Sequence, residues 1–387
     1  MPDNAVPRDW ASELSVVSDA FESGRGLPPA CYTDPAFHAA EIERIFRREW
    51  LCIGRVEEVA QPGDYLTLDM LGDPLVMLRD DDGRLRVLSR VCRHRSMPVI
   101  EGRGNTKTLL CPYHHWTYAL DGRLVGAPEM GKTPGFDAKS VCLPEIRHEV
   151  WEGFVFVNFD ADAPPLSPQL ESVSRLLANY RLSDLRTVRS LPFDIECRWN
   201  WKLMCDNFIE PYHHVGVHLK SLESSLPARL SEIVESDGPW TMVHMRYRKG
   251  RSPEEAPDPD APALPPFPGA DALERRTFTL LHIFPNLLVS FFTDHMQFYR
   301  LFPEGPERVH MEKLFCYPPE AMALPQFDDA VEHNERSFIE FRDEDIDAVL
   351  VLQQAYRSRH AQPGVFSHLE RPIWDFARWI ADRMGRL

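Results

Sequence analysis

The sequence predicts an α+β protein of two domains, a small β domain followed by a larger domain that mixes helices and strands. A chain of 387 residues is longer than one core usually spans. From about residue 45 to residue 160 short β segments alternate with tight turns, and beyond residue 165 both helical and strand patterns occur. The Pro-rich segment ADAPPLSPQ between these regions is typical of a linker.

An N-terminal helix is predicted directly after Asp34. The Asp34 side chain can cap the first turn, and Pro35 suits the first helical position because no backbone N–H is needed there. Apolar residues then recur at helical spacing from Phe37 to Phe46.

Two hairpins and a buried strand are predicted in the β region. The segment PLVMLRDDDGRLRVLS has two strand-like runs around an Asp-Gly turn, and WTYALDGRLV repeats this pattern around Asp121 and Gly122. The segment WEGFVFVNFD then has the continuous apolar pattern of a buried strand.

Helices and strands are both predicted in the second domain. Helical patterns cover residues 167–182, 199–220, 327–358 and 372–385, and the strand-like runs include TFTLLHIF, NLLVSFF and VHMEKLFCY. The segment 251–272 is too rich in proline for regular structure. A loop of that length is either disordered or a lid over a site.

The charge of the chain argues against several classes of partner. Lys and Arg number 43 and Asp and Glu number 59, so the net charge is −16, which repels nucleic acid and anionic membrane surfaces. No segment has the roughly 20 apolar residues of a membrane span, and the N-terminus does not resemble a secretory signal. The eight cysteines are thinly spread, which favours a reducing cytoplasm over a disulfide-built fold.

Four residues of the β region have the chemistry of a metal site. Cys92 and His94 form a Cys-x-His pair, and sixteen residues later Cys111 and His114 form Cys-x-x-His. Two thiolates and two imidazoles on paired hairpin loops can hold either Zn²⁺ or a Rieske [2Fe–2S] cluster. Pro112 suits a tight loop better than the helix that a zinc finger needs.

The pattern C-x-H-x16-C-P-Y-H-x-W-T-Y-x-L-D-G resembles the Rieske domain of Rieske non-heme iron oxygenase α subunits, and the likeness continues to about residue 160. The resemblance implies a [2Fe–2S] cluster bound by Cys92, His94, Cys111 and His114, with a structural zinc ion as the alternative. Of the two adjacent histidines it implies His114 as the ligand, and His115 as a residue that faces solvent or supports a ligand.

A second candidate site lies in the helix-compatible segment NWKLMCDNFIEPYHHVGVH. Two histidines and one carboxylate with open coordination positions are the usual protein ligands of a mononuclear Fe(II) oxygenase. On an ideal helix His214 and His218 share a face, whereas His213 and His218 are about 140° apart. His213 and His218 therefore converge only if the chain is wound differently there. A pair of ordinary core histidines is the alternative.

This segment is similar to the motif N-x-x-[D/E]-x-Y-H-x4-H of the same oxygenases. The residues that align with the motif are Asn207, Glu210, Tyr212, His213 and His218. The resemblance implies His213 and His218 as iron ligands, and Asn207 as a residue of the catalytic site. His214 is the alternative ligand, with a role toward the substrate or in support of a ligand preferred.

The third iron ligand is expected to be a carboxylate far along the chain. Four candidates occur in FRDEDIDAVLVLQQ: Asp343, Glu344, Asp345 and Asp347. In the family the ligand is the acid of an E-D pair with Gln eight residues later, and Asp345 with Gln353 fits that spacing. Asp347 is second, and a solvated helix face is the alternative interpretation.

Glu210 has a separate role in the resemblance. The acid at this position supports a metal-bound histidine and a Rieske histidine of the neighbouring subunit, which would connect His213 with His114 of another chain. Many members of the family have Asp where this chain has Glu.

Over nearly the whole chain the resemblance implies an oxygenase α subunit with three parts. These are a helical segment 1–44 packed on the catalytic domain, a Rieske domain 45–160, and a catalytic domain 161–387 with a helix-grip fold. The cofactors would be the Rieske cluster and mononuclear Fe(II), and the expected assembly is a homotrimer, alone or as part of a larger assembly. A separate reductase or ferredoxin is expected to supply electrons, because the chain has no dinucleotide fingerprint and no ferredoxin cysteine spacing.

Two classes of substrate are compatible with the resemblance. We expect mono- or cis-dihydroxylation of an aromatic or cyclic small molecule with O₂, and the alternative is oxidative N- or O-demethylation of a quaternary ammonium compound or methyl ether. Aromatic residues such as Phe208, Phe284, Phe291 and Phe292 could line an apolar pocket or enclose a cation, and ordinary core packing is the alternative. A Rieske electron carrier or a zinc-binding scaffold is the alternative to an enzyme, although a carrier does not need the residues beyond 160.

Overall fold

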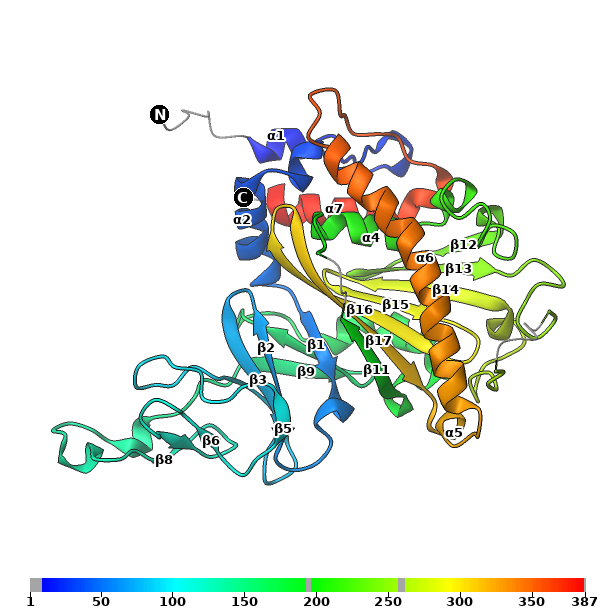
Figure 1. The fold of residues 1–387 in the computed structure, drawn as a ribbon. Helices are drawn as coiled ribbons and strands as arrows, with labels where there is room; N and C mark the ends of the chain where they lie inside the picture. The colour runs from blue at the N-terminus through cyan, green and yellow to red at the C-terminus, as the bar shows by residue number, and fades with distance from the viewer. Residues whose placement is uncertain (1–8, 193–195, 257–261, 386–387) are drawn as a thin grey trace. The chain divides into compact units, whose positions relative to one another are not determined.

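The computed structural model describes residues 9–192, 196–256 and 262–385. The chain divides into two units (Figure 1), one formed by Arg48–Ser167 and the other by Met1–Arg47 together with Pro168–Leu387. The smaller unit is built of strands and the larger of both helices and strands, which confirms the predicted α+β class. Among the described residues no helix combines the length and the apolar character of a membrane span.

Three antiparallel sheets make up the smaller unit, with strand orders β1-β10-β9, β4-β3-β2-β5 and β6-β7-β8. The strands are β1 (Leu51–Arg55), β2 (Asp64–Met70), β3 (Asp73–Arg79), β4 (Leu85–Ser89), β5 (Arg103–Asn105), β6 (Leu109–Leu110), β7 (Thr117–Tyr118), β8 (Leu124–Gly126), β9 (Arg147–Trp151) and β10 (Phe154–Asn158). The Asp-Gly turns occur as predicted. Gly122 has a φ of 90°, and a Cβ there would lie 3.1 Å from the carbonyl oxygen of Leu143, so this turn requires glycine.

A seven-stranded antiparallel sheet forms the centre of the larger unit, in the order β11-β17-β16-β15-β14-β13-β12. The strands are β11 (Arg186–Pro192), β12 (Ser231–Val234), β13 (Trp240–Arg246), β14 (Thr277–Ile283), β15 (Leu287–Phe291), β16 (Met296–Gly305) and β17 (Arg308–Tyr317). The register pairs Ser290 of β15 with Gln297 of β16, and Tyr299 of β16 with Lys313 of β17. Because side chains alternate along a strand, these four residues lie on one face of the sheet.

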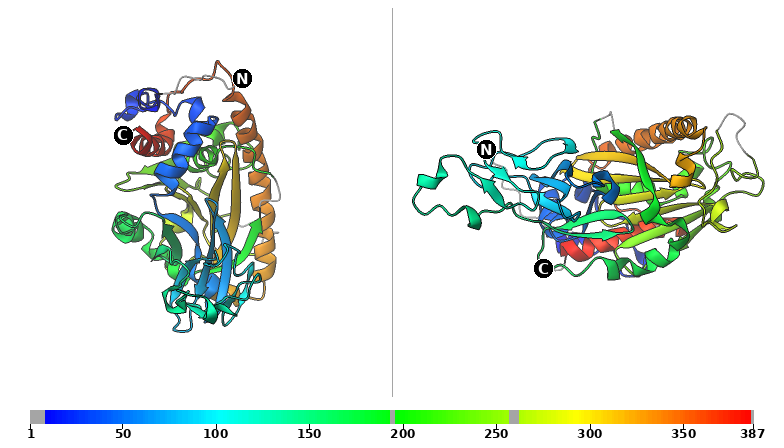
Figure 2. Two further views of the ribbon diagram at one scale, coloured as in Figure 1. Left: turned by 90° about the vertical axis from the view of Figure 1, so that its left-hand side faces the viewer. Right: turned by 90° about the horizontal axis from the view of Figure 1, so that it is seen from below.

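Seven helices accompany the sheets among the described residues. They are α1 (Trp10–Leu14), α2 (Pro35–Glu41), α3 (Glu171–Leu176), α4 (Trp201–Ile209), α5 (Pro319–Met322), α6 (Phe327–Ala355) and α7 (Arg371–Gly385). The long helix α6 runs along the sheet of its own unit (Figure 2), and α4 contacts α6, α7 and three strands of this sheet. The arrangement is the predicted helix-grip fold.

The N-terminal helix begins as predicted, because the Asp34 carboxylate accepts hydrogen bonds from the backbone N–H groups of Ala36 and Phe37. After α2 the chain continues as a π-helical turn over Ile42–Phe46. This N-terminal segment contacts the C-terminal helix α7, and the Arg44 side chain donates a hydrogen bond to the Met384 carbonyl at 2.7 Å.

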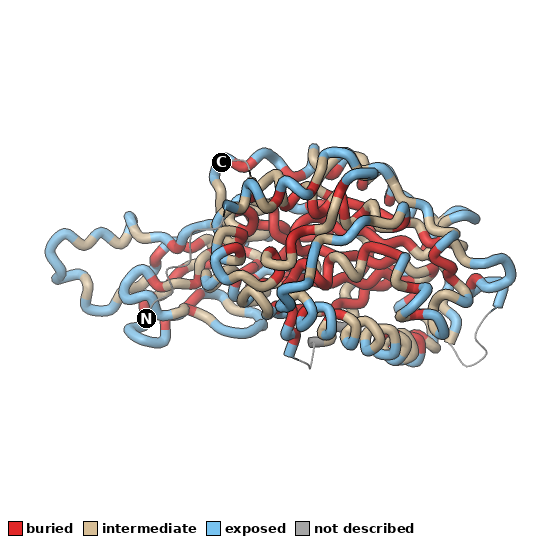
Figure 3. The backbone as a smooth tube through the Cα atoms, turned by 90° about the horizontal axis from the view of Figure 1, so that it is seen from above, coloured by how far each residue is buried: buried red, intermediate tan, exposed pale blue. Residues whose placement is uncertain are grey.

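Burial follows the layers of the larger unit (Figure 3). The strands β13 to β17 of its sheet are buried over most of their length, whereas only one side of α6 is. The buried side of α6 includes Phe338 and Gln353. The Gln353 side chain accepts a hydrogen bond from the N–H of Asn200, the cap of α4, and donates one to the Tyr32 carbonyl. Gln353 therefore joins α6 to the start of α4.

Two predicted helices differ from those in the structure. The helix expected over 199–220 ends at Ile209, because Pro211 disfavours a helical conformation of the preceding residue, and Glu210 is extended with φ −113° and ψ 139°. The helix expected over 167–182 is divided into α3 and short 3₁₀ turns, and Arg181 adopts a positive φ of 50°. The segment 251–272 contains no helix or strand among its described residues, as predicted.

Candidate metal centres

Two loops of the smaller unit have the same backbone structure and present the predicted Cys and His residues. In one loop the N–H of Ser96 donates to the carbonyl of Cys92, and in the other the N–H of His115 donates to the carbonyl of Cys111, both at 3.0 Å. Ser96 and His115 have positive φ values of 59° and 58°. The His115 side chain is exposed, so its part in the loop is to form the turn.

The side chains of the two loops separate into a sulfur pair and an imidazole pair. Cys92 and Cys111 are buried, whereas the Nδ1 atoms of His94 and His114 lie 3.1 Å apart on the exposed side. The Tyr118 hydroxyl lies 3.3 Å from the Cys92 sulfur. Two sulfur ligands at one end and two imidazole ligands at the other fit the two irons of a Rieske cluster.

An apolar core fixes these loops. Trp116 and Tyr118 are buried together with Val76 and Leu88 of the neighbouring sheet. The His94 ring stacks on Trp116 with 4.8 Å between centroids, which orients the imidazole.

The second candidate centre combines three residues from two segments of the larger unit. His213 lies in a 3₁₀ turn over Tyr212–Val215, His218 follows it, and Asp345 comes from α6. Ligand atoms of all three lie within 4.8 Å of one another. His213 and His218 are able to converge because the α-helix has already ended at Ile209, which is the reason that ideal helical geometry misplaces them.

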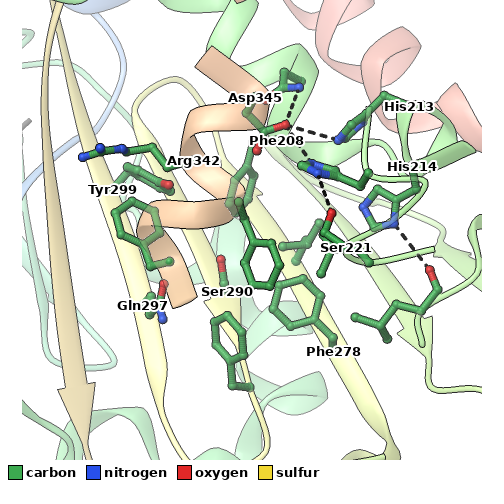
Figure 4. Close-up of a pocket in the computed structure, with 18 of the residues that line it drawn as sticks. Phe208, His213, His214, Ser221, Phe278, Ser290, Gln297, Tyr299, Arg342 and Asp345 are labelled. Carbon is green, nitrogen blue, oxygen red and sulfur yellow. Dashed lines mark hydrogen bonds and ion pairs between the residues drawn. The ribbon is translucent and has the colours of Figure 1, made fainter. Parts of the chain in front are cut away.

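Each histidine is held through Nδ1 by a different carboxylate. Glu210 lies 2.8 Å from Nδ1 of His213, and Glu344 lies 2.6 Å from Nδ1 of His218. The Nε2 atoms of the two histidines lie 3.5 Å and 2.9 Å from Oδ1 of Asp345 (Figure 4). The donor set of two imidazole nitrogens and one carboxylate oxygen fits mononuclear iron.

Asn207 and Ser221 complete the hydrogen bonding around this centre. Nδ2 of Asn207 donates to Oδ1 of Asp345 at 3.1 Å, and the Ser221 hydroxyl donates to Glu344 at 2.6 Å. Burial lowers the pKa of His218, but its hydrogen bonds and charge interactions with Asp345 and Glu344 outweigh that effect, so the pKa is raised. The centre therefore favours a cation.

His214 lies beside this centre but outside the converging set. It is buried, and burial together with the charges of His213 and His218 lowers its pKa to about 3, so its imidazole is neutral at pH 7. Its Nδ1 lies 3.4 Å from the Leu226 carbonyl. Like the ligand candidates, His214 lines the cavity next to the centre.

A cavity of about 240 Å³ opens between α4, α6 and the sheet (Figure 4). Its apolar lining includes Phe208, Leu226, Phe278, Leu280, Phe292, Phe338 and Phe341. Its polar lining, apart from the three ligand candidates, includes Ser290, Gln297, Tyr299, Lys313 and Arg342. A largely apolar cavity with a few polar groups beside a metal centre is typical of a site for a small organic substrate.

Sequence reasoning identified most of this centre but not all of it. Asn207, Glu210, His213, His218 and Asp345 come together, whereas Asp343 and Asp347 are exposed on α6. Glu344 appeared in the sequence only as a candidate ligand, although it contacts His218. Lys313 was not predicted as a site residue. Its signal in the sequence is that it is a charged residue on the inward face of a strand whose other inward residues are apolar.

Two family models match the chain. The model described as "Ring hydroxylating alpha subunit (catalytic domain)" matches residues 183–386, and the model described as "Rieske [2Fe-2S] domain" matches residues 49–139. The first match lies in the larger unit, with the iron-type centre, and the second lies in the smaller unit, with the Cys and His loops.

Individual proteins with similarity to the chain include oxygenase subunits of quaternary ammonium monooxygenases and alpha subunits of aromatic dioxygenases. The glycine betaine monooxygenase oxygenase subunit of Chromohalobacter salexigens is 27% identical, with 98% of this chain and 91% of that protein covered. The biphenyl 2,3-dioxygenase subunit alpha of Rhodococcus jostii is 34% identical over 56% of this chain and 48% of its own length. A solved structure of a quaternary ammonium Rieske monooxygenase has the same fold, with a TM-score of 0.80, 24% identity and coverage of 98% and 99% of the two chains.

Proposed function

Because this chain belongs to the ring-hydroxylating alpha-subunit family, we propose that it is the oxygenase component of a system that uses O₂ to oxidise a quaternary ammonium compound. The chain is a Rieske oxygenase whose cofactors are a [2Fe–2S] cluster and mononuclear iron. The observation that supports the substrate class best is the similarity to glycine betaine monooxygenase over 98% of the chain. The similarity favours oxidation of a quaternary ammonium compound, the alternative expected from the sequence, over hydroxylation of an aromatic ring.

The cofactors are assigned to the residues that converge. Cys92, Cys111, His94 and His114 would hold the cluster, and His213, His218 and Asp345 would hold the iron. When bound, these groups supply single electrons and the activation of O₂. The protein itself orients both iron-binding histidines through Glu210 and Glu344, and its largely apolar cavity would hold the substrate beside the iron.

The aromatic lining of the cavity is compatible with a quaternary ammonium group. Phe208, Phe278, Phe292 and Tyr247 all line it, and aromatic faces attract a trimethylammonium cation. Insertion of one oxygen atom into a C–H bond beside the nitrogen would give a carbinolamine that loses the amine or formaldehyde. The second oxygen atom leaves as water, with two electrons and two protons supplied from outside.

Hydroxylation of an aromatic compound is the second candidate. It is favoured by the similarity to biphenyl 2,3-dioxygenase and by the same apolar lining, which would also accept a ring. The two candidates differ in their products, because ring hydroxylation releases neither amine nor formaldehyde.

The electron donor is a separate reductase or ferredoxin, and the assembly is a homotrimer in which electrons cross between chains. Support comes from Glu210, which is 2.8 Å from His213, and from the exposed position of His114 on its loop. Glu210 would accept hydrogen bonds from both histidines, one in each chain.

The described parts of the segment 251–272, residues 251–256 and 262–272, would control entry to the cavity. Arg251, Glu254 and Leu264 line an outer cavity of about 490 Å³ that shares Ser225, Tyr247 and Phe292 with the inner one. A substrate would reach the iron through this outer cavity.

The test begins with protein purified anaerobically from iron-replete cells. About three irons and two acid-labile sulfides per chain are expected. Oxygen consumption with a surrogate reductase is then measured with glycine betaine, carnitine, γ-butyrobetaine and biphenyl, and amine and formaldehyde are assayed. Consumption coupled to amine or formaldehyde supports the proposal. Coupled consumption only with biphenyl would replace it with the second candidate.

A further inference from the structure

The sheet wall of the catalytic cavity contains a buried lysine. Lys313 of β17 pairs with Tyr299 of β16, lines the cavity and is 2% exposed. Its Nζ lies 3.7 Å from the ring centroid of Tyr299 and 4.7 Å from that of Phe338. Within the described part of the chain, no carboxylate or hydrogen-bond acceptor contacts this ammonium group.

A second buried lysine in the same unit, Lys202, has the carboxylate partner that Lys313 lacks among the described residues. Lys202 is also fully buried, and its Nζ lies 2.6 Å from a carboxylate oxygen of Glu41. A buried ammonium group without such a partner is costly, and two aromatic rings offset only part of that cost. Burial accordingly lowers the pKa of Lys313 well below its usual value, although the charge of Asp345 opposes this effect.

The neighbours of Lys313 on the cavity wall are hydrogen-bonding groups and not acids. Ser290 and Gln297 lie side by side on the same sheet face. Arg342 of α6 also contributes to the lining, but its guanidinium is paired with the exposed Asp343 at 2.8 Å. Among the described residues that line the cavity, Asp345 is the only acid, and it belongs to the candidate iron centre. The wall around Lys313 therefore suits an anion.

We propose that Lys313 binds a carboxylate of the substrate, so that the enzyme acts on organic acids. This inference rests on the proposed function, in that the cavity is the substrate site. Phe338, on which Lys313 stacks, precedes Asp345 by seven residues on α6, which corresponds to about 10 Å along the helix. The carboxylate is thus bound at one end of the cavity, and the other end of the substrate reaches the iron.

The carboxylate requirement applies to both candidate substrate classes. A quaternary ammonium compound would be a zwitterion, with its cation among the phenylalanine rings and its carboxylate at Lys313. An aromatic substrate would be an aromatic acid. A choline-like cation without an acid would leave the buried Lys313 without a carboxylate partner.

The experiment compares acids with their neutral amides in holoenzyme kept anaerobic, so that binding is measured without turnover. The probes are γ-butyrobetaine and its amide, and 3-phenylpropanoate and its amide, titrated by calorimetry. The variants are Lys313→Met, which keeps an unbranched chain, and Lys249→Met, which removes an exposed lysine that does not itself line the cavity. The cluster spectrum and circular dichroism confirm that each variant is folded.

At least tenfold preference of the wild type for one of the acids over its amide is expected. Lys313→Met should lose that preference and Lys249→Met should keep it. Equal affinity for acid and amide, failure of the wild type to bind either acid, or an undiminished preference in Lys313→Met would overturn the inference. Preference for 3-phenylpropanoate alone, lost in Lys313→Met, would support the inference while it contradicts the quaternary ammonium substrate. Turnover of both γ-butyrobetaine and its amide, with equal affinity for the two, would support the quaternary ammonium substrate while it contradicts the inference.

Discussion

At the scale of single residues, the iron centre depends on acids that do not themselves converge on the metal position. Glu210 and Glu344 each contact Nδ1 of one histidine, which leaves the Nε2 atoms of His213 and His218 directed toward Asp345. Such supporting carboxylates fix the imidazole orientation and raise ligand basicity. The motif predicts this role for Glu210, but the parallel role of Glu344 becomes visible only when α6 is placed beside His218.

The Glu344→Ala variant is expected to bind iron about 10- to 100-fold more weakly, because His218 loses the partner of its Nδ1. The cluster spectrum should not change, since the cluster loops lie in the other unit. Iron affinity is measured by competition with a chelator. Asp347→Ala, which removes an exposed acid of the same helix, is the control, and equal affinities of the two variants would contradict the prediction.

The Asp345→Ala variant is expected to lose mononuclear iron and turnover while it keeps the visible spectrum of the cluster. Metal analysis should fall from about three irons to about two per chain, with sulfide unchanged. Full activity would show that another acid is the third ligand. If Asp347→Ala lost iron instead, the assignment would move to that residue.

The residues that could be predicted are those with a chemical pattern in the sequence. The Cys and His spacing identifies the loops at Cys92 and Cys111, and the E-D pair identifies Asp345 among four acids. Lys313 has no motif, because its significance comes from the strands and the helix around it. Its only sequence signal is that Val309, Met311 and Phe315 share its strand face.

At the scale of elements, the end of α4 decides the geometry of the iron centre. Helical periodicity continues through the histidines, but Pro211 stops the helix and lets the next turn bring His213 and His218 together. Pro211 therefore indicated the end of α4 in the sequence, whereas the helical periodicity alone predicted that the helix continues.

The Pro211→Ala variant is expected to retain its fold but to bind less iron, because α4 is then free to extend past Ile209 and rotate His213 away from Asp345. Iron per chain after anaerobic loading is the measurement, and circular dichroism should show no loss of helix. Unchanged iron affinity would mean that contacts other than the proline fix the turn.

The N-terminal segment is joined to α4 by the buried ion pair between Glu41 and Lys202. The Glu41→Ala variant leaves Lys202 without its carboxylate, which should cost about 3–5 kcal/mol in the free energy of unfolding. Glu43→Ala is the matched control, because Glu43 is exposed and its ion pair with Arg47 is worth at most about 1 kcal/mol. Urea denaturation of the two variants measures the difference, and similar midpoints would contradict the prediction.

At the scale of the whole molecule, the fold class and the order of the two kinds of domain were predictable, but the sheet order was not. Hairpin neighbours such as β14 and β15 follow from short connections. The pairing of β11 with β17 joins residues more than a hundred positions apart, and local patterns contain no information about such a partner. The same limit applies to the cavity, whose walls come from α4, the sheet and α6.

The proposed electron route between chains gives the last prediction. If His114 of one chain passes electrons to His213 of a neighbour through Glu210, hybrid assemblies of two inactive chains should regain activity. We expect His114→Ala chains, which lack a functional cluster, and Asp345→Ala chains, which lack iron, to be inactive when each is pure. Differently tagged chains are co-expressed, mixed assemblies are isolated through both tags, and substrate-dependent oxygen consumption is measured. Because an intact cluster and an intact iron then occur only in different chains, recovered activity requires transfer between subunits.

Addition of Glu210→Gln to the His114→Ala chain, which holds the working iron, should slow that recovered activity without loss of iron. Hybrids that contain both chains and remain inactive would show that each chain uses its own cluster.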